Sequence, residues 1–434
     1  MKRFMAAMGI VMFLATQAPA IDSGPGGTIY FSEGENSGRI NKFQIKRLTL
    51  NADWTLAGSE VNVDNVLVNN TYTTWSGWQR RNSLEILDPT HLGGTGQLIQ
   101  PAQVDNSPGN SQNYEVPWDI LKINPSDWSH TKLCNGVYVD SSRNTRYLLK
   151  AVAAPENWAG TSNGISLATV RGIWSADAMA LYDAGGNGIA DDSASEIKAL
   201  GAQTPAAHDA EMGGDGAFYY SAVNTSYLGS VLRTWVDAGG APHKTTYYTI
   251  GGATNPVSLG ATLTGLAVGP GASNPIVYLM SRDNDGAGNR YISIFALKDG
   301  DGDNVVNFNN PNDIVSKVWR RGDFGITPQS SSLEYGGADI EFYRNPGTGD
   351  MFLLANNWYN DWWVVQLADN GLSAVDGKVI KMGGDNAIWG PSNYGGFELD
   401  FNYIEGTIPE PATLLLFGTG ALGVMGWMRR RRMK

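Results

Sequence analysis

The residues best suited to chemistry in this chain lie in two copies of an aspartate-rich loop. Residues 180–191 align without a gap on residues 296–307, and in each copy an apolar segment runs into a turn of Asp, Asn and Gly. Oxygen side chains at positions 1, 3, 5 and 9 of a glycine-bent loop converge on one point, and such hard ligands suit Ca²⁺. Each ion would be structural. The predicted ligands are Asp299, Asp301, Asp303 and Asn307 in one copy and Asp183, Asn187 and Asp191 in the other.

The two loops are not EF-hands, because position 12 carries Ala194 or Asn310 in place of glutamate. They resemble the Asp-x-Asp-Gly-Asp-Gly loops that follow a strand in some bacterial propellers related to sugar dehydrogenases. That resemblance covers only the loop and the strand before it. The alternative is a solvated turn without an ion, which is common in secreted β proteins.

A group of aromatic side chains could bind a sugar. Trp358, Tyr359 and Trp362 surround an Asn-Asp pair, and flat aromatic faces beside amides and carboxylates are a usual platform for carbohydrate. The alternative is that Trp362 and Trp363 begin a strand and pack between sheets.

Four carboxylates alternate with apolar residues on two predicted innermost strands, so we expect them to line a central channel. Two carboxyl groups held about 5 to 10 Å apart could also perform glycoside hydrolysis. These residues are Asp339, Glu341, Glu398 and Asp400.

The sequence contains no recognisable catalytic set. The four histidines lack the i, i+4 spacing of a zinc site, and no Gly-x-Ser-x-Gly elbow or phosphate-binding loop is present. We therefore expect a structural or binding protein rather than an enzyme. A propeller enzyme, such as a sugar oxidoreductase or a glycosidase, stays open as an alternative. The histidines are His91, His130, His208 and His243.

The composition predicts an all-β fold, because 54 Gly, 14 Trp, 18 Tyr and 13 Phe with only 17% charged residues indicate short strands between turns. A unit of three predicted strands, one strand followed by a strand pair, occurs at 264–297 and again at 337–367. A similar unit at 28–45 has the strand pair but lacks the strand before it. Residues 395–403 resemble the missing first strand, so we expect them to close a ring.

The predicted architecture is therefore a β-propeller of about six or seven blades, at roughly 40 to 60 residues per blade. Tandem β-sandwich domains are the alternative. The single helical turn expected in the body lies at 192–199.

Both ends of the chain carry targeting signals. Residues 1–20 have the basic start, apolar centre and small-x-small end of a signal peptide, with Ala18 and Ala20 at the cleavage site and Ile21 as the first mature residue. At the other end, residues 405–411 are a linker, 412–428 a predicted transmembrane helix and 429–434 a basic cytoplasmic tail. The exported body would be residues 21–404.

The C-terminal features resemble the PEP-CTERM sorting signal of Gram-negative bacteria. In that family exosortase, a membrane-embedded cysteine transpeptidase, recognises the tripeptide that stands here as Pro409, Glu410 and Pro411 and removes the hydrophobic tail. The resemblance implies processing by exosortase and signal peptidase, with transient anchoring in the inner membrane. The alternative is an ordinary membrane anchor that is never cut.

Charge and cysteine content limit the partners. Residues 1–20 and 409–434 contain 7 of the 31 Lys and Arg but only one of the 42 Asp and Glu, so residues 21–408 have 24 basic and 41 acidic residues, a net charge of −17. Such acidity disfavours nucleic acid as a partner. The single cysteine, Cys134, excludes an intramolecular disulfide, so the fold must hold by burial alone.

These observations favour an exported, exosortase-sorted protein of the envelope or the extracellular matrix with a structural or interaction role. PEP-CTERM proteins tend to accompany exopolysaccharide production, so polysaccharide is an expected partner. The expected locations are the periplasmic face, the outer surface or the matrix. A carbohydrate-binding, lectin-like propeller is the first alternative function, and a propeller enzyme is the second.

Overall fold

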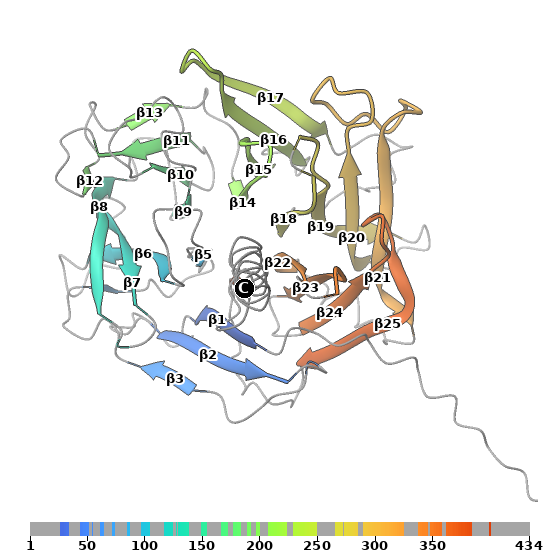
Figure 1. Cartoon of the computed structure of the whole chain (residues 1–434), viewed down its shortest axis with the longest axis horizontal. Coiled ribbons are helices and arrows are strands. Elements are labelled where there is room, and N and C mark those ends of the chain that lie inside the picture. The colour runs from blue at the N-terminus through green and yellow to red at the C-terminus, as the bar shows by residue number, and fades with distance from the viewer. Residues whose placement is uncertain are drawn as a thin grey trace, which may run out of the picture.

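Six β-sheets follow one another around a common centre in the computed structural model of the chain (Figure 1). This all-β, propeller-like arrangement confirms the predicted fold class at that level and differs from tandem β-sandwiches, in which pairs of sheets would pack face to face. The structure describes residues 27–33, 44–51, 54, 61–64, 72–73, 85–86, 97–104, 117–124, 127, 129–138, 149–153, 166–171, 177–183, 189–191, 197–199, 207–223, 229–249, 265–271, 273–284, 290–324, 337–345, 348–357, 362–383 and 399–400.

The last three sheets share one plan, in which four strands pair with their neighbours in chain order. Their hairpins match the predicted strand pairs at 275–297 and 350–367. Sheet 4 contains β14 (Ala207–Met212), β15 (Phe218–Val223), β16 (Gly229–Val236) and β17 (Pro242–Thr249); sheet 5 contains β18 (Leu266–Val268), β19 (Val277–Asn284), β20 (Arg290–Lys298) and β21 (Ile314–Phe324); sheet 6 contains β22 (Gly337–Arg344), β23 (Met351–Asn357), β24 (Trp362–Leu367) and β25 (Ala374–Gly383).

The first three sheets vary this plan. Sheet 1 has the order β26-β1-β2-β3, sheet 2 is built around β6, β7 and β8, and sheet 3 has the order β13-β11-β10-β9. Their strands are β1 (Gly27–Glu33), β2 (Gln44–Leu50), β3 (Val61–Asp64), β4 (Tyr72–Thr73), β5 (Glu85–Ile86), β6 (Leu98–Val104), β7 (Pro117–Ile123), β8 (His130–Tyr138), β9 (Leu149–Ala153), β10 (Ser166–Arg171), β11 (Asp177–Tyr182), β12 (Ala190–Asp191), β13 (Ile197–Ala199) and β26 (Leu399–Asp400).

One local prediction was wrong where the structure describes it. At the end of the helical turn expected at 192–199, Ile197 to Ala199 form strand β13, because they pair with β11 and extend that sheet. The strand expected at 39–45 overlaps β2 at Gln44 and Ile45, and residues 39–43 lie outside the described residues.

Strands β5, β9, β14, β18 and β22 lie nearest the centre in Figure 1. With β26 they contact one another in the order β26, β5, β9, β14, β18, β22 and back to β26. In sheet 1 the first position belongs to the C-terminal strand, since Leu399 pairs with Phe31 and Asp400 with Tyr30. Trp54, which follows β2, packs its ring 5.2 Å from that of Phe352 in sheet 6. Both contacts join the two ends of the described chain.

The core lies between neighbouring sheets. The middle strands are buried on both faces, so they read as continuous apolar runs, such as 277–280 and 351–355, rather than as an alternating pattern. Polar bonds also cross from sheet to sheet. The Tyr278 hydroxyl of sheet 5 donates to the Gly371 carbonyl of sheet 6 over 2.8 Å, and a positive φ of 71° suits glycine at that turn.

No helix of the described part of the chain is long and apolar enough to cross a membrane. The predicted span at 412–428 lies outside the described residues, as do the signal peptide at 1–20, the cleavage residues Ala18, Ala20 and Ile21, and the tripeptide Pro409 to Pro411.

Candidate functional site

The Asp299 carboxylate organises the predicted calcium loop after β20. Although only 5% exposed, it accepts three backbone N–H bonds: Oδ1 from Asp301 and Gly302 at 3.1 and 2.7 Å, and Oδ2 from Asn304 at 2.7 Å. Bonds to an ionised acceptor are stronger than neutral ones, so one buried side chain fixes the first turn of the loop.

The backbone of this loop explains its composition. Gly302 has a φ of 83° and Asn304 a φ of 66°, a conformation that glycine and asparagine tolerate best. A Cβ on Gly300 would lie 1.6 Å from the carbonyl oxygen of Asn312, so only glycine fits there. Asp313 closes the other end of the loop by accepting N–H bonds from Gly300 and Asn307 at 2.9 and 2.8 Å.

The acidic cluster in this loop differs from the predicted ligand set. Asp299, Asp301 and Asp313 each place an oxygen within 4.8 Å of the others, whereas Asp303 is not part of that group, and Asp303 and Asn307 are exposed. The Asn310 amide donates to Asp301 over 2.8 Å, and this bond is the main reason that the pKa of Asp301 is lowered. The geometry therefore offers three carboxylates to a cation and also satisfies them with N–H donors.

The loop crosses from sheet 5 to the outer strand of sheet 4. The Val306 N–H donates to the Tyr247 carbonyl over 2.6 Å, and Val306 forms a parallel bridge with Tyr248 in β17. We call residues 299–306 the second crossing loop. It provides a backbone connection between two sheets that otherwise meet through side chains.

The first copy of the repeat makes the same crossing. Strand β12 pairs in parallel with Cys134 and Asn135 of β8, the outer strand of the preceding sheet, and Ala190 is the bridging residue. Ala190 is the seventh residue after Asp183, as Val306 is the seventh after Asp299. Asp183 is also buried, with 1% exposed. The described ends of residues 183–190, which we call the first crossing loop, thus cross to the preceding sheet as those of the second crossing loop do.

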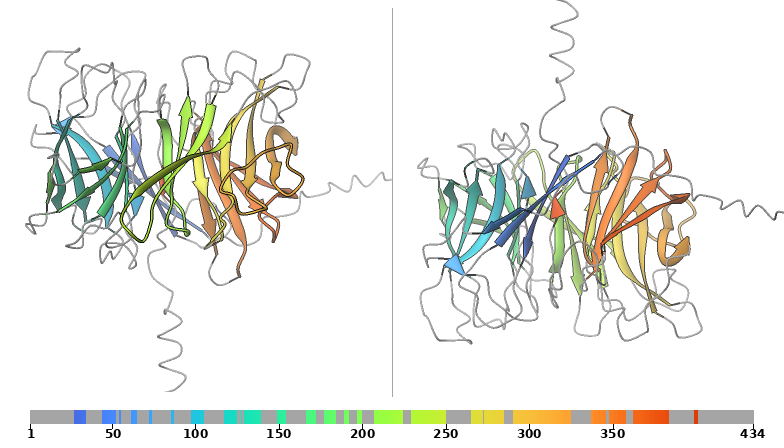
Figure 2. Two further views of the ribbon diagram at one scale, coloured as in Figure 1. Left: turned by 90° about the horizontal axis from the view of Figure 1, so that it is seen from above. Right: turned by 90° about the horizontal axis from the view of Figure 1, so that it is seen from below.

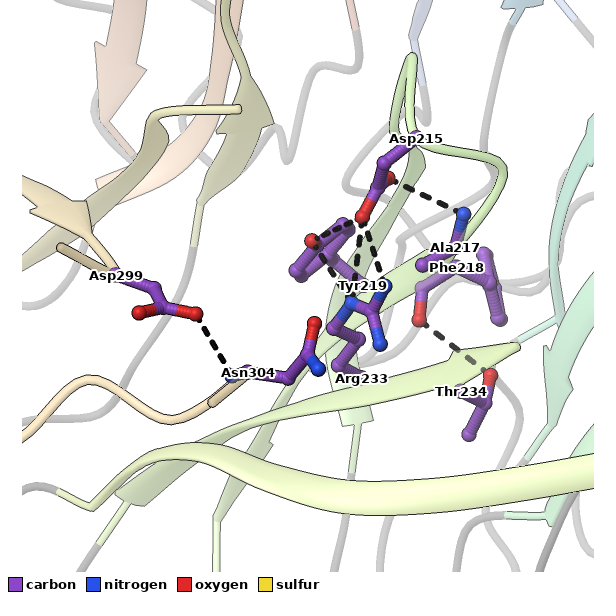
Figure 3. Close-up of polar contacts among 8 residues, drawn as sticks. All are labelled: Asp215, Ala217, Phe218, Tyr219, Arg233, Thr234, Asp299 and Asn304. Atoms are coloured by element: carbon purple, nitrogen blue, oxygen red, sulfur yellow. Dashed lines mark hydrogen bonds and ion pairs between the residues drawn. The ribbon is translucent and has the colours of Figure 1, made fainter. Parts of the chain in front are cut away.

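An ion pair stands beside the second crossing loop, in sheet 4 (Figure 3). Arg233 Nη2 lies 3.0 Å from Asp215 Oδ2, and both side chains are buried. The Tyr219 hydroxyl donates to the same oxygen over 2.8 Å and accepts from Arg233 Nε at 3.1 Å. The guanidinium also stacks 4.5 Å from the centre of the Trp235 ring. All of these contacts lie within sheet 4, so the cluster ties the turn between β14 and β15 to β16.

Tyr247 connects the ion pair to the crossing loop. Its ring meets that of Tyr219 edge-on at 5.2 Å, while its carbonyl accepts the bond from Val306. Burial, reinforced by the negative charge of Asp215, raises the pKa of Tyr219, and burial raises the pKa of Tyr247 as well. Both phenols therefore stay neutral at physiological pH; Tyr219 acts as a donor to Asp215, and Tyr247 acts as a packing surface.

A third buried carboxylate joins sheets 4 and 5 near the centre. Asp209 Oδ2 accepts the backbone N–H of Leu266, the first residue of β18, over 2.6 Å. Its Oδ1 accepts from Ala210 at 2.9 Å, and its own N–H donates to the Ser221 hydroxyl at 3.0 Å. Buried acids in this body thus accept backbone N–H groups within and between sheets.

The other predicted site residues are not brought together with this cluster. Among the channel carboxylates, Glu341 is buried in β22 with 6% exposed, Asp339 lies in the same strand, and Asp400 pairs with Tyr30. Trp362 begins β24, as the alternative interpretation predicted. Outside the described residues lie Asn187, Trp358, Tyr359 and Glu398. The channel and the sugar platform remain predictions.

Four important residues were missed: Asp209, Asp215, Arg233 and Asp313. One signal could have revealed Asp209, because Asp209-Ala210-Glu211 repeats the pattern of Asp339-Ile340-Glu341, and each copy follows a register shift in its strand. Arg233 and Asp215 are 18 residues apart and meet only through the pairing of β15 with β16.

Comparison with known proteins identifies the tail. Residues 407–432 match the PEP-CTERM protein-sorting motif, so the chain ends in a PEP-CTERM sorting signal, as the sequence indicated. This motif implies export and sorting by exosortase. No curated protein matches the chain.

Several solved structures resemble the body at low identity. An α-L-arabinanase of Penicillium chrysogenum, complexed with arabinobiose, is 10% identical with a TM-score of 0.45 and covers 68% of this chain and 80% of its own. The PQQ-bound aldose sugar dehydrogenase of Streptomyces coelicolor is 13% identical with a TM-score of 0.40, covering 74% and 99%. At identities and TM-scores this low, neither structure is a basis for assigning a substrate.

We predict that Asp299→Asn lowers the free energy of unfolding by about 1–3 kcal/mol, because an amide nitrogen would replace one buried acceptor oxygen and face a backbone N–H. The matched control is Asp303→Asn, whose exposed side chain accepts one bond, from Val305 at 2.8 Å, and which should change stability by less than about 0.5 kcal/mol. Urea unfolding followed by tryptophan fluorescence measures both. Equal effects of the two substitutions would contradict this role of Asp299.

Proposed function

We propose that this chain is a non-enzymatic, exosortase-sorted protein of a Gram-negative envelope or extracellular matrix, with a structural or interaction role associated with exopolysaccharide. The observation that carries the proposal is the sorting motif at residues 407–432. The acidic body supports it, because a net negative charge keeps a secreted protein soluble and apart from nucleic acid. The arrangement of the buried carboxylates supports it too, since Asp209, Asp215 and Asp299 accept bonds that fasten sheets and turns.

We further propose that the body closes as a six-bladed propeller, with β26 as the innermost strand of the first blade. The pairing of β26 with β1 and the cyclic contacts of the first strands support closure. Closure removes the exposed inner edge that β1 would otherwise present, which protects a secreted sheet protein from edge-to-edge association.

We also propose that Ca²⁺ binds between Asp299, Asp301 and Asp313. Their oxygens lie within 4.8 Å of one another, and a divalent cation would relieve the repulsion between three carboxylates. Millimolar Ca²⁺ should then raise the melting temperature of the protein, and Asp313→Asn should abolish the rise while Asp303→Asn keeps it. Differential scanning fluorimetry checks this; no rise in the unaltered protein would refute the calcium site.

The sorting proposal predicts that the released protein lacks the hydrophobic tail. In the native host, mass spectrometry of the mature C-terminus should find no peptide from residues 412–434. Glu410→Ala should leave the tail on and hold the protein in the membrane fraction, because the tripeptide is what exosortase recognises. Glu405→Ala removes a carboxylate from the same linker outside the tripeptide and should be processed normally. An intact tail on the final product of the unaltered chain would rule out exosortase cleavage.

A further inference from the structure

The place where the chain leaves the body has a defined side. Strand β26 runs antiparallel to β1, with Leu399 opposite Phe31 and Asp400 opposite Tyr30. The chain after Asp400 therefore continues toward the Gly27 end of β1. Strand β1 is the second strand of sheet 1, as β15, β19 and β23 are the second strands of sheets 4, 5 and 6. Its Gly27 end lies on the side where first strands connect to second strands.

The same side carries the connections between third and fourth strands, because neighbouring strands alternate in direction. Figure 2 shows the sheets from the side, with the strands running between two opposite faces. We call the side on which the tail leaves the turn face. Six of its connections fall mostly within the described residues, at 213–217, 237–241, 269–276, 299–313, 345–350 and 368–373.

The turn face is acidic. These six connections contain eight aspartates and no lysine or arginine; from the neighbouring strands Arg233 pairs with Asp215 and the exposed Arg344 donates to the Gly349 carbonyl at 3.4 Å, so aspartates remain in excess. Asp237, Asp301, Asp303 and Asp369 are exposed. The His243 ring lies 2.8 Å from Asp237, and this hydrogen bond lowers the pKa of the Asp237 carboxyl. An anionic lipid surface would repel this face within about a Debye length, roughly 8 Å at physiological ionic strength.

Chain length limits how the body can sit over the membrane. Eight residues lie between Asp400 and Pro409, so the two are at most about 30 Å apart. The eight residues of β17 give the body a height of about 27 Å, and three strand spacings from the centre to the rim add about 14 Å. A tail that starts at the centre of the turn face is thus too short to pass around the rim to the opposite face.

We infer that the anchored precursor is held with its turn face toward the membrane, and that the aspartates of this face keep the body off anionic headgroups so that Glu410 is accessible to a membrane-embedded enzyme. This inference rests on the proposed sorting function. It assigns the crossing loops to the membrane-facing side and leaves the opposite face for partners in the periplasm or the matrix.

Single-cysteine labels at the two ends of β17 test the orientation, since the one native cysteine, Cys134, is buried. Ala238 is exposed on the turn face, and Thr249 is exposed at the far end of the strand. The chain with its tail intact is reconstituted into vesicles of phosphatidylethanolamine and phosphatidylglycerol that carry an acceptor dye on the headgroup. Because about 27 Å separates the sites, energy transfer should be about twofold or more greater from Ala238→Cys than from Thr249→Cys.

Equal transfer, or greater transfer from Thr249→Cys, would overturn the orientation while flotation with the vesicles still supported the anchor. A chain that does not float would overturn the anchor and the orientation with it. Asp369→Cys, on another turn of the same face, replaces Ala238→Cys if that variant misfolds. Exchanging phosphatidylglycerol for phosphatidylcholine should raise transfer from the turn-face label, because the repulsion is removed; unchanged transfer would contradict the role of the aspartates.

Discussion

The structure depends on how neighbouring sheets are held to one another. Within each sheet neighbouring strands pair through backbone hydrogen bonds, and contacts between sheets come from packed side chains and from a few polar connections. Buried aspartates supply several of these, because an ionised carboxylate can accept backbone N–H groups from more than one segment. Asp209 reaches from β14 to β18, and Asp299 shapes a loop that bridges to β17.

Contacts between sheets also explain the sequence repeat of residues 180–191 and 296–307. Asp183 and Asp299 each follow the third strand of a sheet, and seven residues later Ala190 and Val306 bridge to the outer strand of the preceding sheet. In the second copy this crossing explains the residue types first, since Asp299 supplies the acceptor and Gly302 the positive φ that the loop requires. A calcium ion would add to the crossing rather than create it. The ion pair of Arg233 and Asp215 supports the same interface through Tyr219 and Tyr247.

Much of the fold was predictable because its signals are local. Apolar runs such as 277–280 and 351–355 belong to strands buried on both faces, and the sorting tail is a contiguous motif. The site was predictable only in part. The gap-free repeat identified both loops, but Asp313 joins the acidic cluster from the far end of a long connection. Arg233 meets Asp215 through hairpin register, which residue types alone do not encode. The strand at 197–199 was missed because three residues are too few for a periodic pattern.

Hydrogen exchange of the crossing-loop amides tests the central claim most directly. If the second crossing loop fastens sheet 4 to sheet 5, the amides of Gly302, Asn304 and Val306 should exchange as slowly as those of β20, although residues 301–303 are exposed to solvent. Asp299→Asn should accelerate all three together. If these amides exchanged at the rate of a free turn in the unaltered protein, the account would be contradicted, because the loop would then not fasten sheet 4 to sheet 5.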